Sequence, residues 1–571
     1  MDWIGGGRVI LRLTVVDRAT GDSLDAEVTA QPNNSVASLL AVLPFADGNR
    51  PCYVGRHQLD PNTTIADSHI VHGCVISIGA PGDDLVADHH SLGALHVRSG
   101  PDAGLTVCLP AGTHTIGTAP DCVVRLTDPH VQPHHSSLVV GPGVATLHSH
   151  AGTSPLHPAM AERNINLADG STAEIGANVV EWLPIVAIPG QRDRTPDGRL
   201  IFDRAYAPAP GIRRLQLSVP NEPTTTHNSG ALWASLLVPM LLAGAAALFF
   251  RSPAMLLFVL LGPLTFLASF FIERRQRKAQ RRDYEGKMAA LRRQIKEHVA
   301  DEESRRRALA PTAPALMAAA VGATRGLWPR NLDDPDGLVL RLGTGDEPAS
   351  VDITSPDAPP DLVPPVRDVP ITVDLRKVGV LGVVGPPSKA DGLLRWLIVQ
   401  LAVLRSPDGL RLVVLTDVTS TELAWTSWLP HVDAGEGGDV RCWIGNTPET
   451  RAARLGELRE LITARKAELT GTTQVRFDEV VVILHGALSL RGAPGMRDLL
   501  LDGPSVGIYV IACDIADINE CRAVCRIDEH GATLQLARDA DVRPLEVEHI
   551  SLGAAQRVAR ALAPMRYRLS L

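Results

Sequence analysis

Lysine and aromatic residues are scarce in this chain. Its 571 residues include six lysines and 4% aromatic side chains, and the formal net charge is −8 at pH 7. Binding along a nucleic-acid backbone depends on a broad surface of lysine and arginine, so we expect no nucleic-acid partner. A hydrophobic fraction of 45% indicates folded cores, and the length predicts several domains.

Cysteine pairs at short spacing are also lacking. The eight cysteines are spread over the whole chain with no CxxC pair, at positions 52, 74, 108, 122, 442, 513, 521 and 525. Disulfide frameworks and zinc sites usually show such pairs. We therefore expect reduced, partly buried thiols.

Histidines gather in one region, at positions 130, 134, 135, 148, 150 and 157. His134 and His135 are adjacent, so a strand would point their side chains to opposite faces. In the sequence, no carboxylate or cysteine lies beside them at ligand spacing. We expect structural or exposed histidines and no metal site.

Two uncharged segments, 231–250 and 254–272, flank Arg251, Ser252 and Pro253. Each is long enough to cross about 30 Å of hydrocarbon as a helix. The basic stretch 274–282 follows, and the positive-inside rule then places both ends in the cytoplasm. We expect a two-helix transmembrane hairpin, in a two-pass protein of the inner (plasma) membrane that contacts lipids. A buried hairpin of a globular core is the alternative.

Residues 1–85 predict a small β-grasp-like domain. An alternating strand over 8–17 precedes a helical pattern over 35–43 and short strands at 53–55 and 74–78. The Tyr-Val-Gly step at 53–55, the turn at 59–61 and the His-Gly pair at 72–73 resemble the ubiquitin-like domains of type VII secretion components.

Residues 91–187 predict a β-sandwich, with short strands and frequent turns. Segments 113–118, 121–126 and 131–138 resemble the forkhead-associated (FHA) domain, which holds phosphothreonine with a Gly-Arg pair, a Ser three residues before a His, and a later Asn-Gly. Gly117 and His135 match, but Thr118 stands at the Arg position and Gln132 at the Ser position. Without the guanidinium fork we expect an FHA-like scaffold whose phosphopeptide site is lost.

A linker over 188–230 is expected to be extended, and stalk helices are expected over 273–325. In the stalk, apolar side chains recur at spacings of three and four, at Tyr284, Met288, Leu291, Ile295 and Val299. This pattern predicts an amphipathic helix that packs on a partner helix or on its own domain, with a solvated stalk as the alternative.

The last region, 326–571, predicts a mainly parallel sheet covered by helices. Strands over 378–384, 410–415, 440–444, 480–484 and 508–512 alternate with helices over 391–404 and 448–469. Five features of this region are distinctive: the Leu-Trp pair at 327–328, the Asp-Pro-Asp at 334–336, the strand end at 341–345, and segments 428–431 and 559–566. Together they resemble the FtsK/SpoIIIE-type membrane ATPase of type VII (ESX-like) secretion systems, the EccC/EssC-like family.

The nucleotide motifs expected of that family are altered. Gly385 matches the first glycine of a P-loop, but Ala390, Asp391 and Gly392 occupy its Gly, Lys and Ser/Thr positions, and His485 ends the strand where an acid would support Mg²⁺. An aspartate repels phosphate. We therefore expect a degenerate RecA/P-loop-like α/β domain without cofactor or catalytic residues, in a chain that is not an enzyme.

The fold class expected is thus multidomain α/β plus β. The resemblance implies active ATPase modules after Leu571, so we expect a separate ATPase or a truncated chain. The predicted function is a non-catalytic, membrane-anchored component that scaffolds a type VII secretion channel, docks the ATPase, and forms oligomers with other membrane subunits. The alternatives are an FHA-type phosphopeptide-sensing membrane adaptor and a truncated fragment of an active secretion ATPase.

Overall fold

The computed structural model describes residues 9–567 apart from 47–49, 83–90, 150–163, 169–170, 185–189, 204–210, 212–213, 223–236, 239, 243–244, 246–248, 250–260, 356–358, 360, 418–420, 434–441, 470–475 and 538–540. The chain divides into two compact units. Unit 1 comprises Met1–Pro210, Arg307–Gly345 and Pro370–Leu571, and unit 2 comprises Gly211–Arg306 and Asp346–Val369.

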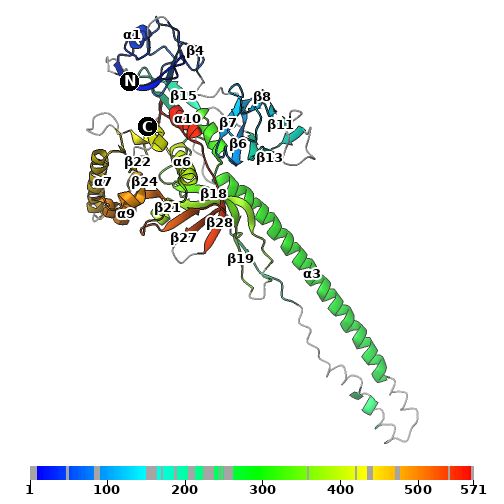
Figure 1. The fold of residues 1–571 in the computed structure, drawn as a ribbon. Helices are drawn as coiled ribbons and strands as arrows, with labels where there is room; N and C mark the ends of the chain where they lie inside the picture. Colours follow the sequence, from blue (N-terminus) through cyan, green and yellow to red (C-terminus); the bar gives the residue numbers. More distant parts are fainter. Residues whose placement is uncertain are drawn as a thin grey trace. The chain divides into compact units, whose positions relative to one another are not determined.

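The first part of unit 1 is a five-stranded sheet in the order β2-β1-β5-β3-β4 (Figure 1). Its elements are β1 (Val9–Asp17), β2 (Ser23–Ala30), α1 (Val36–Leu40), β3 (Cys52–Val54), β4 (His57–Gln58) and β5 (Val75–Ile78). β1 pairs antiparallel with β2 and parallel with β5. Leu11, Leu13 and Val15 alternate along β1 and are fully buried, which is why this segment forms a strand with one face on the core.

A sandwich of two sheets follows, in the orders β12-β11-β10-β8-β9 and β13-β14-β6-β7. The strands are β6 (Ser91–Ser99), β7 (Thr106–Pro110), β8 (Gly112–Gly117), β9 (Val124–Arg125), β10 (Ser136–Gly141), β11 (Val144–Ser149), β12 (Asn164–Leu167), β13 (Thr172–Ile175) and β14 (Asn178–Pro184). Both sheets contribute to one core around the fully buried Trp182. A Cβ on Gly93 would lie 2.1 Å from the Trp182 ring, so the indole needs a glycine opposite it.

The largest part of unit 1 contains a ten-stranded sheet in the order β20-β18-β28-β27-β26-β21-β25-β24-β22-β23. Its strands are β18 (Val339–Glu347), β20 (Val366–Asp374), β21 (Val380–Val384), β22 (Leu410–Thr416), β23 (Ile444–Gly445), β24 (Glu479–His485), β25 (Ile508–Asp514), β26 (Ala523–Ile527), β27 (Ala532–Leu536) and β28 (Val542–Val547). The run from β26 through β21, β25, β24 and β22 to β23 is parallel, as the sequence predicts, and β27 and β28 extend it antiparallel.

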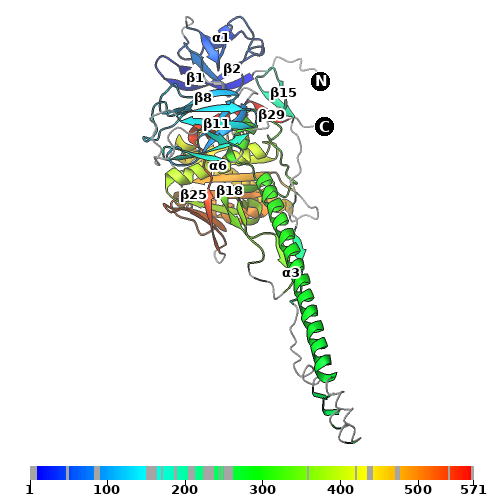
Figure 2. The ribbon, with the colours of Figure 1, turned by 90° about the vertical axis from the view of Figure 1, so that its right-hand side faces the viewer.

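Helices cover both faces of this sheet (Figures 1 and 2). They are α4 (Ala313–Val321), α5 (Leu375–Val378), α6 (Pro387–Leu404), α7 (Pro448–Leu469), α8 (Ala487–Leu490), α9 (Met496–Asp502) and α10 (Leu552–Leu562). Successive strand residues point to opposite faces. Leu381 and Val383 therefore join the core that contains α4, α6 and α10, whereas Val380 and Val384 join the core that contains α7, α8 and α9.

Unit 2 contains most of the long helix α3 (Leu261–Leu309) and a two-stranded ladder of β17 (Leu215–Leu217) and β19 (Val351–Ile353). Met288, Leu291 and Ile295 are buried in a small cluster with Leu362. The amphipathic helix is therefore confirmed, and its apolar stripe packs on segments of its own unit.

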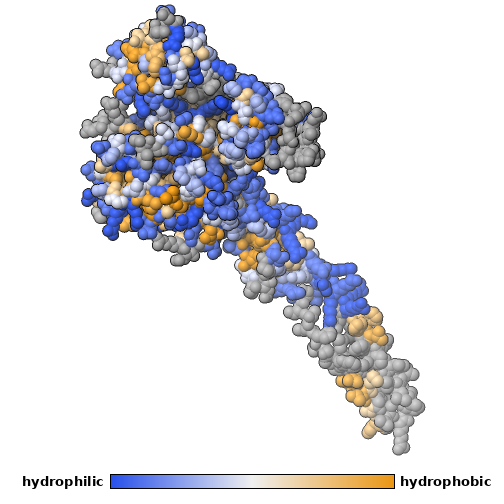
Figure 3. Space-filling model, in the orientation of Figure 1, coloured by the Kyte–Doolittle hydropathy of each residue, from blue (hydrophilic) through white to orange (hydrophobic). Residues whose placement is uncertain are grey.

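The predicted membrane hairpin is contradicted. Across the described residues, no helix combines the length and the apolar character needed to cross a bilayer. The side chains of Phe271 and Ile272, on α3, are exposed, and Figure 3 shows hydrophobic residues on the surface of the long helix.

Most of 231–260, including Arg251, Ser252 and Pro253, lies outside the described residues. The expectation of a two-pass membrane protein with two cytoplasmic ends is corrected on the same finding.

Candidate functional site

Polar side chains meet where the parallel strands of the ten-stranded sheet end. β22, β24 and β25 end at one edge, because parallel strands share their carboxyl edge. Asp417 follows β22, His485 ends β24 and Asp514 ends β25. The side chain of Asp391, on α6, lies beside His485 at the same edge. We call Asp391, Asp417, His485 and Asp514 the edge cluster.

The edge cluster is held by an ion pair and by backbone contacts. His485 Nε2 lies 3.0 Å from Asp391 Oδ1, and both side chains are largely buried. Ser489 Oγ donates to Asp417 Oδ2 at 2.7 Å, and the amide of Leu488 donates to Asp514 Oδ2 at 2.9 Å.

The backbone at Gly486 lies close to the carboxylate of Asp417. It has a φ of +80°, and a Cβ there would lie 2.3 Å from the Asp417 carboxyl carbon. Glycine at this position therefore serves both the left-handed backbone conformation and the close approach of the carboxylate.

The histidine of the edge cluster favours its charged form. The hydrogen bond to Asp391 raises the pKa of His485 above its usual value, burial opposes that shift, and Asp417 and Asp514 add to it through their charge. The shift thus favours the protonated imidazole beside the Asp391 carboxylate. The pair with Asp391 therefore offsets part of the negative charge of the edge cluster.

The connection between β21 and α6 is much shorter than the sequence suggests. We expect the helix from Asp391, but α6 begins at Pro387, because a proline fits the first helical position. Gly385 and Pro386 alone join strand and helix. Pro386 and Pro387 have no N–H groups, so this helix start lacks two donors with which P-loop backbones cradle phosphate.

The predicted P-loop residues therefore lie mainly inside a helix. Ala390 is buried, and Gly392 packs so closely on His549 that a Cβ would lie 3.0 Å from Nδ1. Gly385 donates its amide to the carbonyl of Asp514 at 3.2 Å. Lys389, the nearest lysine, donates to the carbonyl of Asp528 at 3.0 Å.

The four FHA-type positions come together on two loops of the sandwich. Thr118 donates its amide to the carbonyl of Gln132 at 3.1 Å, and His135 donates its amide to the carbonyl of Ile116 at 2.9 Å. A Cβ on Gly117 would lie 2.0 Å from the carbonyl oxygen of Pro133. Gly117, Thr118, Gln132 and His135 thus form the contact between the loops, and none of them is a lysine or an arginine.

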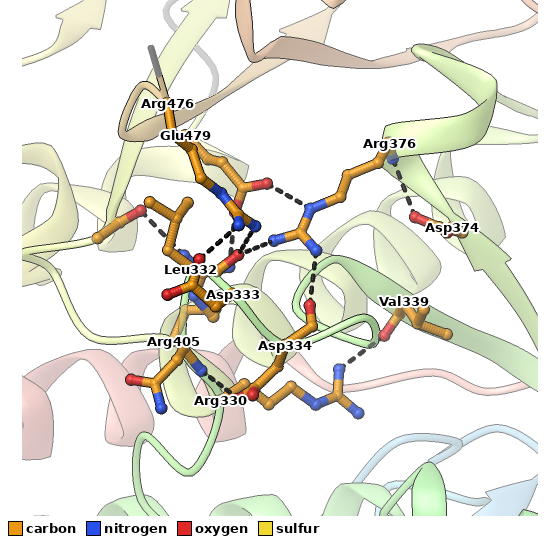
Figure 4. Close-up of polar contacts among 12 residues, drawn as sticks. Arg330, Leu332, Asp333, Asp334, Val339, Asp374, Arg376, Arg405, Arg476 and Glu479 are labelled. Atoms are coloured by element: carbon orange, nitrogen blue, oxygen red, sulfur yellow. Dashed lines mark hydrogen bonds and ion pairs between the residues drawn. The ribbon is translucent and has the colours of Figure 1, made fainter. Parts of the chain in front are cut away.

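Sequence reasoning missed a buried ionic network at the opposite edge of the parallel sheet (Figure 4). Glu479, which begins β24, accepts from Arg376 Nε at 2.5 Å and from Arg405 Nη1 at 2.6 Å. Arg376 also donates to the carbonyls of Leu332 and Asp334. The network fastens the 332–334 segment to the sheet.

An open cavity of about 320 Å³ lies between the sheet and α7. It is lined by Arg411, Val413, Trp443, Glu457, Leu458, Glu460, Leu461, Ala464 and Val480. The Arg411 guanidinium lies 4.6 Å from the centre of the Trp443 ring, a cation–π contact at its wall. The cavity is mostly apolar with charged groups at its rim.

A signal for two edge-cluster residues was available in the sequence. Asp417 and Asp514 each stand one or two residues beyond a predicted strand, at 410–415 and 508–512. Acidic residues directly after parallel strands predict a polar site at the carboxyl edge. No such signal links Glu479 to Arg376, since 103 residues separate them.

Comparison with known proteins finds that this chain is similar to type VII secretion proteins. It is 27% identical over 251 residues to the ESX-4 secretion system protein EccC4 and 30% identical over 172 residues to the ESX-3 secretion system protein EccC3, both of Mycobacterium tuberculosis. It is 27% identical over 275 residues to the ESX secretion system protein YukB of Bacillus subtilis.

These matches cover 40%, 27% and 43% of this chain, and they span 20%, 13% and 18% of the respective relatives. No protein-family model matches the chain.

Two kinds of solved structure also match parts of this chain. The cytoplasmic domain of the type VII secretion ATPase EccC from Thermomonospora curvata matches with 15% identity over 42% of this chain and 32% of that chain, with a TM-score of 0.30. An FHA domain studied for phosphothreonine-dependent interactions matches with 25% identity over 16% of this chain and 97% of that chain, with a TM-score of 0.15.

The homologues of this chain are thus EccC-type proteins of type VII secretion, in the FtsK/SpoIIIE family, and the predicted resemblance is confirmed. The prediction that the chain is not an enzyme is contradicted, because its sequence homologues are EccC proteins, and the EccC of Thermomonospora curvata among them is described as a type VII secretion ATPase. That prediction rested on two altered nucleotide motifs in one domain, and it extended their loss to the whole protein.

Proposed function

We propose that this chain is a component of a type VII (ESX-like) secretion system that scaffolds the secretion channel and docks an ATPase subunit. Its similarity to ESX secretion proteins supports the system, and the partners proposed are the other subunits of that system. The single observation that carries the docking role is the open, mostly apolar cavity beside α7.

The chemistry of this cavity suits a partner segment with an apolar side chain. Leu458, Leu461 and Val413 supply apolar walls, and Trp443 offers a flat aromatic surface. Buried aromatic and arginine side chains contribute most of the binding energy in protein interfaces. Arg411 and Glu457 at the rim would fix the orientation of the partner through polar contacts.

A cavity-filling substitution tests this docking role. Ala464 lines the cavity and is exposed, so Ala464→Trp should fill the space without removing a core side chain. We expect the full chain carrying Ala464→Trp to bind an ATPase subunit of the system at least about tenfold more weakly, as for an interface hot spot. Ala453→Trp, exposed on α7 but not lining the cavity, is the matched control. Equal binding by the two variants would reject the cavity as the docking site.

We also propose that the connection after β21 is not built to hold nucleotide phosphates. The support is the direct passage from Gly385 and Pro386 into α6, together with the Asp391–His485 pair. Residues Ala390 and Gly392 then serve helix packing. The carboxylate of Asp391 forms an ion pair with His485 inside the protein.

For the sandwich we propose that the phosphopeptide site is lost. The support is that Gly117, Thr118, Gln132 and His135 meet between two loops without a guanidinium among them. We propose the domain boundaries as 1–85, 91–187 and 326–571, with a linker over 188–230 and a stalk over 273–325.

A further inference from the structure

Three side chains with different ligand atoms meet on the β-sandwich. The ligand atoms of Asp121, Cys122 and His134 all lie within 4.8 Å of one another. Asp121 Oδ2 and His134 Nε2 are 2.9 Å apart. Carboxylate oxygen, thiolate sulfur and imidazole nitrogen are the ligand atoms that zinc takes in proteins.

The two loops that carry these ligands are fastened to each other. Ala119 donates its amide to the carbonyl of Pro133 at 3.0 Å, and the Cys122 thiol lies 3.2 Å from the same carbonyl. The amide of Cys122 in turn donates to the carbonyl of Ala119 at 3.1 Å. The backbone therefore brings the ligands together before any ion arrives, which lowers the ordering cost of binding.

We propose that Asp121, Cys122 and His134 form a binding site for a zinc-class divalent cation, with a fourth coordination position open to solvent. Metal–ligand bonds of about 2.0–2.3 Å in a tetrahedron set the ligand atoms roughly 3.3–3.8 Å apart. Asp121 and His134 at 2.9 Å lie closer than that range and no pair of the three exceeds 4.8 Å, so side-chain rotations can adjust the spacing. Asp121 and His134 are exposed while Cys122 is buried, which gives one anchored ligand and two that close over the ion.

From the sequence we expect no metal site here, because only ligands close together along the chain can be recognised. In the structure the three ligands come from two loops. An Asp–His ion pair by itself is the competing explanation, since the hydrogen bond to His134 already lowers the pKa of Asp121. The pair of Asp128 and His130, at 3.0 Å, provides the comparison. Among the described residues, no ligand group of three includes that pair.

The test uses the full chain and Co²⁺ or Zn²⁺ alone. Titration with Co²⁺ should give one equivalent with a sulfur-to-cobalt charge-transfer absorption, absent in Cys122→Ser. Zn²⁺ affinity, measured by competition with a chromophoric chelator, should fall at least about tenfold in Asp121→Asn and His134→Ala, because loss of even an outer-shell partner costs that much. His130→Ala and Cys108→Ser should bind like the wild type.

Folding of each variant is checked by circular dichroism. If Cys122→Ser does not fold, Asp121→Asn and His134→Ala decide the matter, because both side chains are exposed and their loss should leave the fold intact. Equal Zn²⁺ affinity in the wild type and these two variants would overturn the proposal. Co²⁺ binding without a thiolate band in the wild type would overturn it as well.

Discussion

Glu479→Gln removes the carboxylate that Arg376 and Arg405 share at the start of β24. The side chains of Glu479 and Arg405 are 5% and 1% exposed, so water cannot replace the lost partner. Removing one member of a buried ion pair costs about 3–5 kcal/mol, since the remaining charge stays buried. Glutamine keeps the volume and one acceptor oxygen. We therefore expect the free energy of unfolding to fall by about 3 kcal/mol, at the lower end of that range.

Chemical denaturation of the full chain, followed by tryptophan fluorescence, measures this loss. Five of the tryptophans report on the α/β part, namely Trp328, Trp396, Trp425, Trp428 and Trp443. Asp502→Asn is the matched control, because it breaks the half-exposed pair with Lys466 at 2.9 Å. Such surface pairs contribute about 0–1 kcal/mol. A loss in Glu479→Gln no larger than in Asp502→Asn would refute the reasoning.

Three further predictions concern the two candidate sites. The stability that the His485–Asp391 pair contributes is complete below the ordinary histidine pKa of about 6.5 and is lost as pH rises through the raised folded value. Asp391→Asn should remove this pH dependence, measured by urea unfolding at several pH values, and an unchanged slope would contradict it. Lys389→Ala should leave the Mg-ATP affinity of the full chain unchanged in calorimetry, because Lys389 donates to Asp528 and not into a phosphate cradle; a clear loss would show that the connection after β21 does contact nucleotide. A phosphothreonine peptide library should bind no better than its unphosphorylated counterpart. Selective binding that His135→Ala abolishes would show a working site.

Patterns along the chain predicted the elements well where short apolar runs form fully buried strands. The buried strands β21, β22, β24 and β25 lie within two residues of their predicted bounds, and α7 begins at Pro448 as predicted. There Thr450 donates its amide to Thr447 Oγ1 at 3.2 Å, the expected helix cap. Local hydrogen bonding and continuous apolar runs decide such features, so the sequence of a single segment is enough to predict them.

These local patterns could not predict contacts between segments that are far apart in the sequence. Asp121 and His134 come from different loops, and Glu479 lies 74 residues from Arg405. Treating residues 385–392 as a loop failed for a local reason, since Pro387 starts α6 earlier than the apolar pattern indicates. Cys521 and Cys525 have helical spacing, but β26 contains Cys525 and is a strand, because β21 pairs with it.

A small sheet within unit 1 has a consequence for synthesis of the chain. β15 (Gln191–Arg194) pairs with β16 (Leu200–Asp203), which pairs parallel with β29 (Met565–Tyr567). Beside them Arg199 reaches the carbonyl of Ala563, 364 residues further on. At about 5–20 residues per second, a ribosome needs roughly 20 to 70 seconds to supply that partner. Until then the edge of β16 stays open to strands of other chains. Nascent chains should therefore depend on a chaperone during this interval.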